Sequence, residues 1–118
     1  MNSALLDIIE DMGAEVEDTL ERLMDDEELY LEYLEQLPEN ENILELRDAV
    51  DAGDCSKAEK EVHTLKGIAL NLGLLPLADV CMDMLMDLRE GRKEEGLGLI
   101  NEVEEEFNRW ANAIKENR

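Results

Sequence analysis

The placement of its helix-breaking residues is the feature that most constrains this chain. Proline occurs only at positions 38 and 76, and most of the seven glycines fall between segments whose apolar residues recur every three or four positions. That spacing is the period of an α-helix, whereas a half-buried strand needs strict alternation. Glycine and proline therefore separate a series of helices, and no segment makes a convincing strand. We expect an all-α fold.

The N-terminal half of the chain predicts short helices. Apolar residues over 5–9 and over 16–24 form two short helical faces, which we expect to cap one end of a bundle. A longer pattern over 29–37 is interrupted by Pro38 and then resumes as far as Gly53. Because proline removes an internal hydrogen bond, this region is either one kinked helix or two abutting helices, and the sequence leaves both open.

The C-terminal half predicts three longer helices. A helix over 55–72 has Asp54 as a good N-cap and Gly73 as its C-terminal stop. The next segment, over 76–91, has a proline in its first turn, where proline is well tolerated. A last amphipathic helix covers 97–114. Four main helices with short connections predict an antiparallel up-and-down four-helix bundle with one or two short N-terminal capping helices.

The length and composition agree with such a bundle. A chain of 118 residues and 13.5 kDa can build one hydrophobic core but not two, so we expect a single domain over 1–118 with one site. Hydrophobic residues make up 44 % of the chain and aromatic residues only 3 %. The core is therefore expected to consist mainly of aliphatic side chains and methionine, as in small helical bundles.

The charge balance excludes two classes of partner. The chain has 32 acidic and 11 basic residues, which gives a formal net charge of −21. Nucleic acids and anionic membranes would be repelled, so we expect neither as a partner, and a basic or metal-bearing partner is favoured. The alternative is that the acidity only keeps the protein soluble.

The cysteines and the N-terminus indicate an intracellular location. Cys55 and Cys81 lack both a CxxC spacing and histidine companions, so they are interpreted as small buried hydrophobic residues. No run approaches the roughly 18 apolar residues of a membrane span. No basic segment precedes an apolar stretch at the N-terminus. We expect a cytoplasmic protein, and Met1 with a complete helix set favours a free-standing one over a fragment of a larger kinase.

His63 is the only histidine in the chain, and helical phase places it on an exposed surface. A histidine imidazole is partly neutral near pH 7 and is then a usable nucleophile. A lone histidine is more often structural, but the usual structural explanation is burial. At about 100° per residue, His63 lies outside the apolar stripe of its helix. That stripe consists of Ala58, Val62, Leu65, Ile68, Ala69 and Leu72.

Two neighbours of His63 fit a site for a phosphoryl group. Gly67 lies one turn further on, where glycine costs roughly 1 kcal/mol relative to alanine but leaves room for a phosphate or for a partner's backbone. Lys66 can place its ammonium group near the imidazole and offset the charge of a phosphate. Close helix packing is the alternative explanation for Gly67. Ordinary pairing of the lysines with Glu59 and Glu61 is the alternative for Lys66.

The residues around His63 resemble a known family. The signature H-x-[LI]-K-G-x-[AS]-x-x-[LIVF]-G of histidine-containing phosphotransfer (Hpt) domains is similar to the string HTLKGIALNLG at 63–73. Flanking segments over 52–54, 77–81 and 13–34 also resemble the family. The resemblance implies a helical bundle in which His63 is the phosphoacceptor, Lys66 steadies the phosphohistidine, and Gly67 admits the phosphate and the partner.

This chain departs from the family pattern at two positions and offers a candidate docking surface. Ile68 replaces the small residue that is common after the Lys-Gly pair, and Leu85 stands where the following helix often carries Glu or Gln near the histidine. The second departure changes how the imidazole or its phosphate is hydrogen-bonded. We expect partner docking at Lys60, Leu70, Met82, Leu85 and Met86, since flexible methionines beside a reactive site suit more than one partner. A wide core helix is the alternative explanation for the methionines.

The resemblance implies a carrier rather than an enzyme. The chain has neither a phosphate-cradling glycine-rich loop nor kinase motifs, so the phosphoryl group has to come from another protein. Receiver domains and a hybrid sensor histidine kinase are the implied partners, with Mg²⁺ held by the receiver and with no cofactor or metal in this chain, which we expect to be a monomer. One rival is a helical adaptor that docks on response regulators without carrying phosphate. A carboxylate-bridged metal enzyme is a weaker rival, because such sites need a second histidine.

Overall fold

The structure, a computed structural model, describes residues 3–118 and is helical throughout. The predicted all-α fold is confirmed, since these residues contain no strand. The elements are α1 (Ser3–Asp11), α2 (Val16–Arg22), α3 (Glu27–Glu35), a 3-10 turn η1 (Leu37–Glu39), α4 (Asn42–Asp51), α5 (Cys55–Asn71), α6 (Leu75–Arg89), α7 (Lys93–Leu97) and α8 (Ile100–Glu116).

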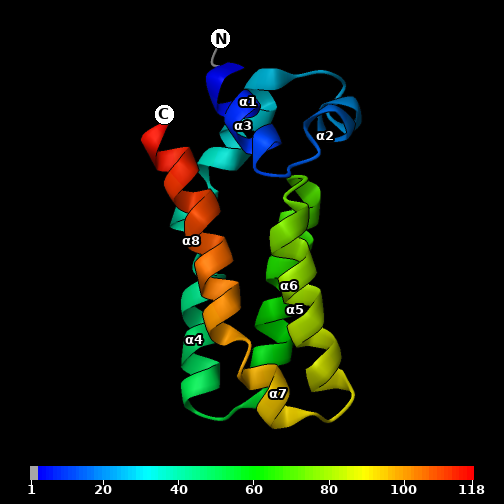
Figure 1. Cartoon of the computed structure of the whole chain (residues 1–118), viewed down its shortest axis with the longest axis vertical. Coiled ribbons are helices and arrows are strands. Elements are labelled where there is room, and N and C mark those ends of the chain that lie inside the picture. The colour runs from blue at the N-terminus through cyan, green and yellow to red at the C-terminus, as the bar shows by residue number, and fades with distance from the viewer. Residues whose placement is uncertain (1–2) are drawn as a thin grey trace.

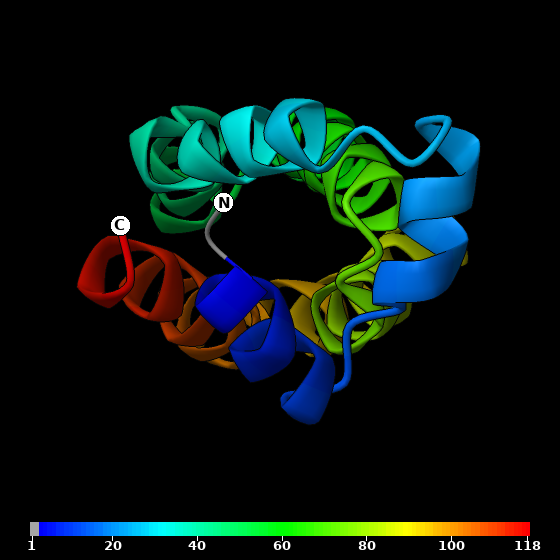
Figure 2. The same ribbon diagram turned by 90° about the horizontal axis from the view of Figure 1, so that it is seen from above.

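Four helices lie along the long axis of a molecule that measures 44 × 24 × 20 Å. Helix α5 packs against α6 and α4, and α8 packs against the other sides of α6 and α4 (Figures 1 and 2). The three N-terminal helices gather at one end of this group, near the C-terminus (Figure 1). The short helix α7 lies at the opposite end and connects α6 to α8. This arrangement leaves the outer face of α5 open to solvent.

The region around Pro38 is two helices and not one kinked helix. Helix α3 ends at Glu35, and Pro38 lies within the 3-10 turn η1. The chain then starts α4 afresh, because the Asn40 side chain accepts a hydrogen bond from the Ile43 backbone N–H at 3.3 Å. Proline cannot donate a backbone hydrogen bond, so the break at this position resolves the alternative that the sequence left open.

The last helix begins later than its apolar pattern indicates. Leu97 belongs to α7, which the sequence did not predict, and α8 begins at Ile100. The glycines on either side of Leu97 explain the break. A Cβ atom at Gly96 would lie 2.8 Å from Leu88, so α7 approaches α6 too closely for any larger residue. The predicted start of the last helix at residue 97 is therefore wrong, because Leu97 ends the separate short helix α7.

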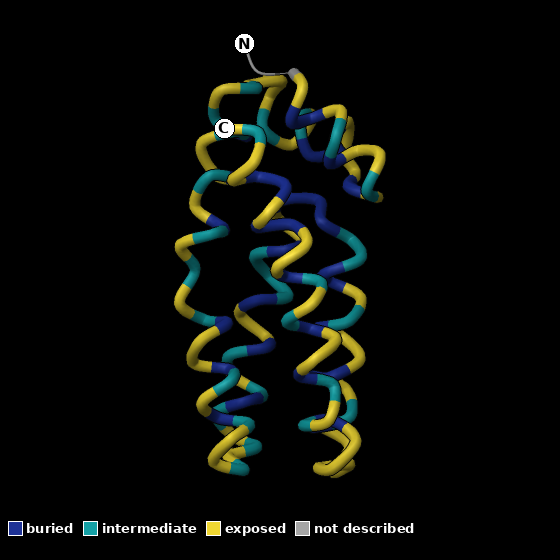
Figure 3. Tube along the Cα trace, turned by 60° about the vertical axis from the view of Figure 1, so that its left-hand side comes forward, coloured by how far each residue is buried: buried dark blue, intermediate teal, exposed yellow. Residues whose placement is uncertain are grey.

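Buried residues form inward stripes on the long helices (Figure 3). In α8 the predicted apolar positions Val103, Phe107, Trp110 and Ile114 are buried. In α5 the predicted stripe is confirmed at its buried positions, which are Ala58, Val62, Leu65, Ala69 and Leu72, whereas Ile68 is only half-buried.

The two cysteines differ in their surroundings. Cys81 is fully buried, as predicted, and burial raises the pKa of its thiol to about 12. Cys55 is only half-buried, because it is the first residue of α5 and lies at the end of the buried stripe. The prediction of burial is therefore correct for Cys81 and too strong for Cys55. Both are free thiols.

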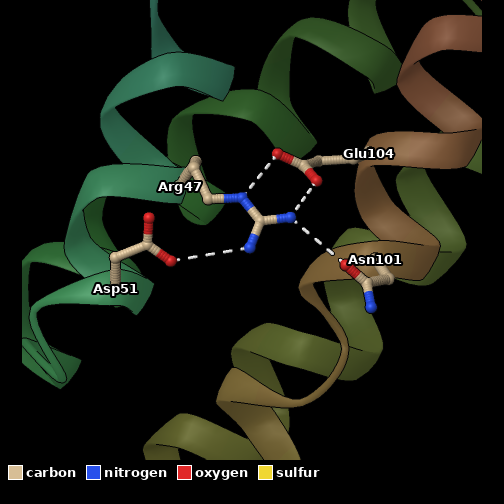
Figure 4. A network of polar contacts seen from close by, with 4 residues as sticks. All are labelled: Arg47, Asp51, Asn101 and Glu104. Carbon is tan, nitrogen blue, oxygen red and sulfur yellow. Dashed lines mark hydrogen bonds and ion pairs between the residues drawn. The ribbon is translucent and has the colours of Figure 1, made fainter.

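A polar network joins α4 to α8 (Figure 4). The Arg47 guanidinium donates to both carboxylate oxygens of Glu104, with an Nε–Oε2 distance of 2.9 Å. It also donates to Asn101 at 3.2 Å and pairs with Asp51 at 3.5 Å. A two-pronged arginine–carboxylate contact fixes orientation as well as distance, so this network holds α4 and α8 in register.

Candidate functional site

The helix that carries His63 is defined by signals at both of its ends. Asp54 caps the N-terminus, where its side chain accepts a hydrogen bond from the Lys57 backbone N–H at 3.0 Å. Gly73 ends the helix with φ of +75°, a conformation that residues with a Cβ rarely adopt. His63 lies at the midpoint of this 17-residue helix and is exposed.

The N-terminal helices hold the C-terminal end of α5. The Tyr30 hydroxyl donates to the Leu72 carbonyl at 2.7 Å, and burial raises the pKa of Tyr30 to about 12. The Arg22 guanidinium donates to the Leu70 carbonyl at 3.2 Å and to the next carbonyl at 3.4 Å. These bonds satisfy carbonyls that a helix end leaves without intrahelical partners. The position of the α5 end is therefore set by α2 and α3.

Gly73 lies at the joint where α2 and α3 contact the C-terminal end of α5, and its surroundings leave no room for a side chain. Its carbonyl accepts a hydrogen bond from the Glu15 backbone N–H at 2.8 Å. A Cβ atom at Gly73 would lie 2.3 Å from the Thr19 hydroxyl and 2.9 Å from the Glu15 carbonyl oxygen. Close approach of backbone as well as the positive φ therefore requires glycine at this position.

The imidazole of His63 makes no hydrogen bond or ion pair with any residue of the described part of the chain. Its helix directs it away from the core residues Val62 and Leu65, which are fully buried. An imidazole that is exposed and unbonded keeps a nitrogen lone pair available for attack on an electrophile. The placement predicted from helical phase is confirmed.

Gly67 lies one turn from His63 with open space beside it. A Cβ atom built there would meet no heavy atom within 4 Å. Close packing against another helix of the bundle therefore does not explain this glycine. A mid-helix glycine lowers helix stability by roughly 1 kcal/mol relative to alanine. We interpret the open space beside His63 as the feature for which this cost is accepted.

The acidic neighbours of His63 have other partners than the adjacent lysines. Glu59 pairs with an arginine of α6 at 3.1 Å, and Glu61 accepts a hydrogen bond from Asn42 of α4 at 2.7 Å. Lys60 and Lys66 make no ion pair with any residue over 3–118. The alternative of ordinary pairing with Glu59 and Glu61 is therefore not seen. Two uncompensated positive charges flank the histidine.

The third lysine of this segment is engaged elsewhere. Lys57 pairs with Glu45 of α4 at 2.7 Å. The contact raises the pKa of Lys57 and lowers the pKa of Glu45, mainly through their hydrogen bond. Lys57 therefore fastens α5 to α4, and the free positive charge is concentrated at Lys60 and Lys66.

Four of the five predicted docking residues are at the surface. Lys60 and Leu70 are exposed on α5, and Met82 and Met86 are exposed on α6. Leu85 is fully buried, so its assignment to the docking surface is wrong. Its place among the buried residues of α6 follows from helical spacing, because Cys81 lies four residues before it and Leu88 three residues after it. Leu85 also cannot supply the hydrogen bond that Glu or Gln would give.

The sequence did not indicate a groove of about 540 Å³ at the C-terminal end of α5. Ile68 lines its α5 side, so the residue that departs from the family pattern packs against the edge of the core and also borders the groove. Arg22, Tyr33 and Asn40 line the opposite side. These residues lie far from His63 in the chain, and no local pattern brings them together. The groove exists only because α2, α3 and η1 fold over the end of α5.

The described residues provide no site for a metal and no span for a membrane. They contain no group of three or more metal-ligating side chains. Within the same residues, no helix has both the length and the apolar character needed to cross a bilayer.

Comparison with known proteins agrees with this geometry. The sequence model of the Hpt domain family matches residues 4–113, which is nearly the whole chain. No curated protein and no solved structure matches the chain. Proteins of the Hpt family carry phosphoryl groups on histidine in two-component phosphorelays and are not kinases. With a match of this extent and an exposed histidine at the midpoint of α5, the chain belongs to the Hpt domain family.

Proposed function

We propose that this protein is a phosphorelay intermediate, which accepts a phosphoryl group on His63 from the aspartate of one receiver domain and passes it to another. The observation that carries the proposal is the exposed, unbonded imidazole beside the open space at Gly67. Lys60 and Lys66 support it, because their free ammonium groups can offset the charge of a bound phosphoryl group.

The transfer step follows from the chemistry of imidazole. The lone pair of His63 Nε2 attacks the phosphorus of the partner's aspartyl phosphate in line, and an N–P bond forms as the P–O bond breaks. The aspartate leaves as a carboxylate with the electron pair of that bond, and the proton on Nδ1 is released to solvent. In the reverse direction, the carboxylate of a second receiver attacks the phosphohistidine. Mg²⁺ on the receiver stabilises the charge on the phosphoryl oxygens.

Three finer statements belong to the same proposal. The partners are response-regulator receiver domains and a hybrid sensor histidine kinase. The protein acts as a cytoplasmic monomer without a cofactor of its own. Its helices form the antiparallel up-and-down four-helix bundle with N-terminal capping helices, which the packing of α4, α5, α6 and α8 supports.

Transfer from phosphorylated receivers tests this function directly. We expect the wild-type protein to acquire an acid-labile, base-stable label when it is mixed with ³²P-labelled receiver domains. His63→Gln removes the nucleophile and is expected to abolish the label. The matched control is Thr64→Ala, which changes an adjacent exposed side chain and leaves the imidazole intact.

The same experiment separates the carrier from the adaptor. Equal label on His63→Gln and wild type, or no label on the wild type from any receiver tested, refutes the relay function. Receivers that bind both proteins equally without transferring phosphate would establish the adaptor instead.

A further inference from the structure

One ion pair sets the alignment of α5 against α6 beside the histidine. Arg89, the last residue of α6, contacts Glu59 near the start of α5 at 3.1 Å. The two helices therefore run in opposite directions, and residues further along α5 lie level with earlier residues of α6. Counting one turn along α5 from Glu59 and one turn back along α6 from Arg89 places His63 about level with Leu85. Lys66 lies level with Met82 in the same way.

The side of α6 that borders this part of α5 is apolar and exposed. Arg89 marks that side, and Met86 and Met82 precede it by three and seven residues, which places them on the same edge of the helix. Their exposed fractions are 48 % and 36 %. Leu70, exposed by 43 %, continues the row on α5. We call Leu70, Met82 and Met86 the apolar strip.

The two borders of the apolar strip carry opposite charge. Lys60 and Lys66 lie on the α5 side without an ion pair. On the α6 side, Asp79 and Asp83 are exposed one turn apart, and neither carboxylate makes a hydrogen bond or an ion pair with the described residues. Most other positive charges of the chain are engaged in ion pairs. The face around His63 is therefore polarised across the strip.

We propose that this polarised face binds a partner whose apolar ridge is bordered on one side by basic residues, which lie over Asp79 and Asp83. The proposal rests on the proposed function and adds the chemistry and orientation of the partner. The partner's acceptor carboxylate then faces His63, Lys60 and Lys66 on the other side of the ridge. Opposite charges on the two borders fix one orientation, since the reversed complex would place like charges together.

The net charge of the protein favours this partner over a second copy of the chain. At a net charge of −21, two copies of the chain repel each other, and the chain also repels any partner with a uniformly acidic surface. A basic row supplies the long-range attraction that brings an acidic acceptor site to His63. After the two proteins meet, the apolar strip adds hydrophobic contact, and its flexible methionine side chains adapt to the partner's surface.

Charge reversal at the acidic border tests the proposal. The double variant Asp79→Lys/Asp83→Lys is compared with Glu102→Lys/Glu105→Lys, which makes the same change in net charge on exposed residues of α8. The assay measures KM for a receiver domain that exchanges phosphate with the wild type. At low salt we expect the first variant to raise KM by about tenfold and the control by less than about twofold. At 0.5 M salt the difference is expected to shrink to about twofold.

A second measurement separates failure of this inference from failure of the proposed function. Phosphoramidate is a small donor that phosphorylates histidine without docking, so it is expected to label wild type and both variants equally. Equal labelling with a KM for Asp79→Lys/Asp83→Lys at or below that of the control overturns the polarised face and leaves the carrier function intact. If the wild type exchanges phosphate with no receiver, the proposed function fails and this inference fails with it.

Discussion

Replacement of Gly67 by alanine is expected to raise stability and to lower phosphotransfer. A mid-helix glycine costs about 1 kcal/mol relative to alanine, and the new Cβ would meet no heavy atom within 4 Å. The free energy of unfolding should therefore rise by about 1 kcal/mol. With an unfolding entropy of about 2.1 cal/mol/K per residue, this corresponds to an increase in Tm of about 4 °C for a chain of this length.

The same methyl group occupies the space that the phosphoryl group or the partner's backbone requires. We expect the transfer rate from a phosphorylated receiver to fall with Gly67→Ala and to fall further with Gly67→Leu, while neither variant is less stable than wild type. Calorimetry gives Tm, and the rate of label transfer gives function. Thr64→Ala is the control, because it also improves helix propensity but fills no space. A loss of stability in Gly67→Ala, or an unchanged rate in Gly67→Leu, would refute this reasoning.

The remaining predictions concern the joint at the end of α5, the buried thiol and the charge beside the histidine. Gly73→Ala combines a positive φ with a clash against backbone, so it is expected to lower the unfolding free energy by at least about 1–2 kcal/mol in urea titration. Tyr30→Phe leaves a buried carbonyl unbonded and is expected to cost about 1–3 kcal/mol by the same measurement. Iodoacetamide at pH 8 should modify Cys55 and spare Cys81 in the folded protein, because the raised pKa of Cys81 leaves little thiolate; mass spectrometry of the digested protein checks this. Lys66→Gln is expected to slow transfer without lowering Tm, and an equal loss of both would indicate a structural role.

The sequence predicted the bounds of α5 and the exposure of His63 well because each signal there is local. A capping aspartate, a terminal glycine and a mixture of charged and apolar residues fix both the ends and the phase of the helix. Helix α6 is different, because leucine and methionine occupy several sides of it. The apolar pattern alone then does not show how wide the buried face is, and packing against the other helices includes Leu85 in that face and leaves Met82 and Met86 exposed.

The other features that the sequence did not predict depend mainly on contacts between segments that are distant in the chain. The groove is built by Arg22 and Tyr33 against Ile68, so its walls come from segments that are distant in the chain. The short helix α7 exists because Gly96 lets it approach Leu88, and a pattern of apolar residues does not report such a contact. The region around Pro38 was ambiguous because proline both kinks and ends helices.

The anchoring of α5 at both ends has a consequence for signalling. Lys57 near its first turn pairs with Glu45 of α4, while Tyr30 and Arg22 hold its last turn, so the helix that carries His63 has supports at both ends. Addition of a phosphoryl group at the exposed midpoint breaks none of these supports. We therefore expect the phosphorylated and unphosphorylated proteins to share one backbone shape. A partner that distinguishes them would then have to contact the phosphate itself, and the signal would be carried by the covalent group and not by a change of conformation.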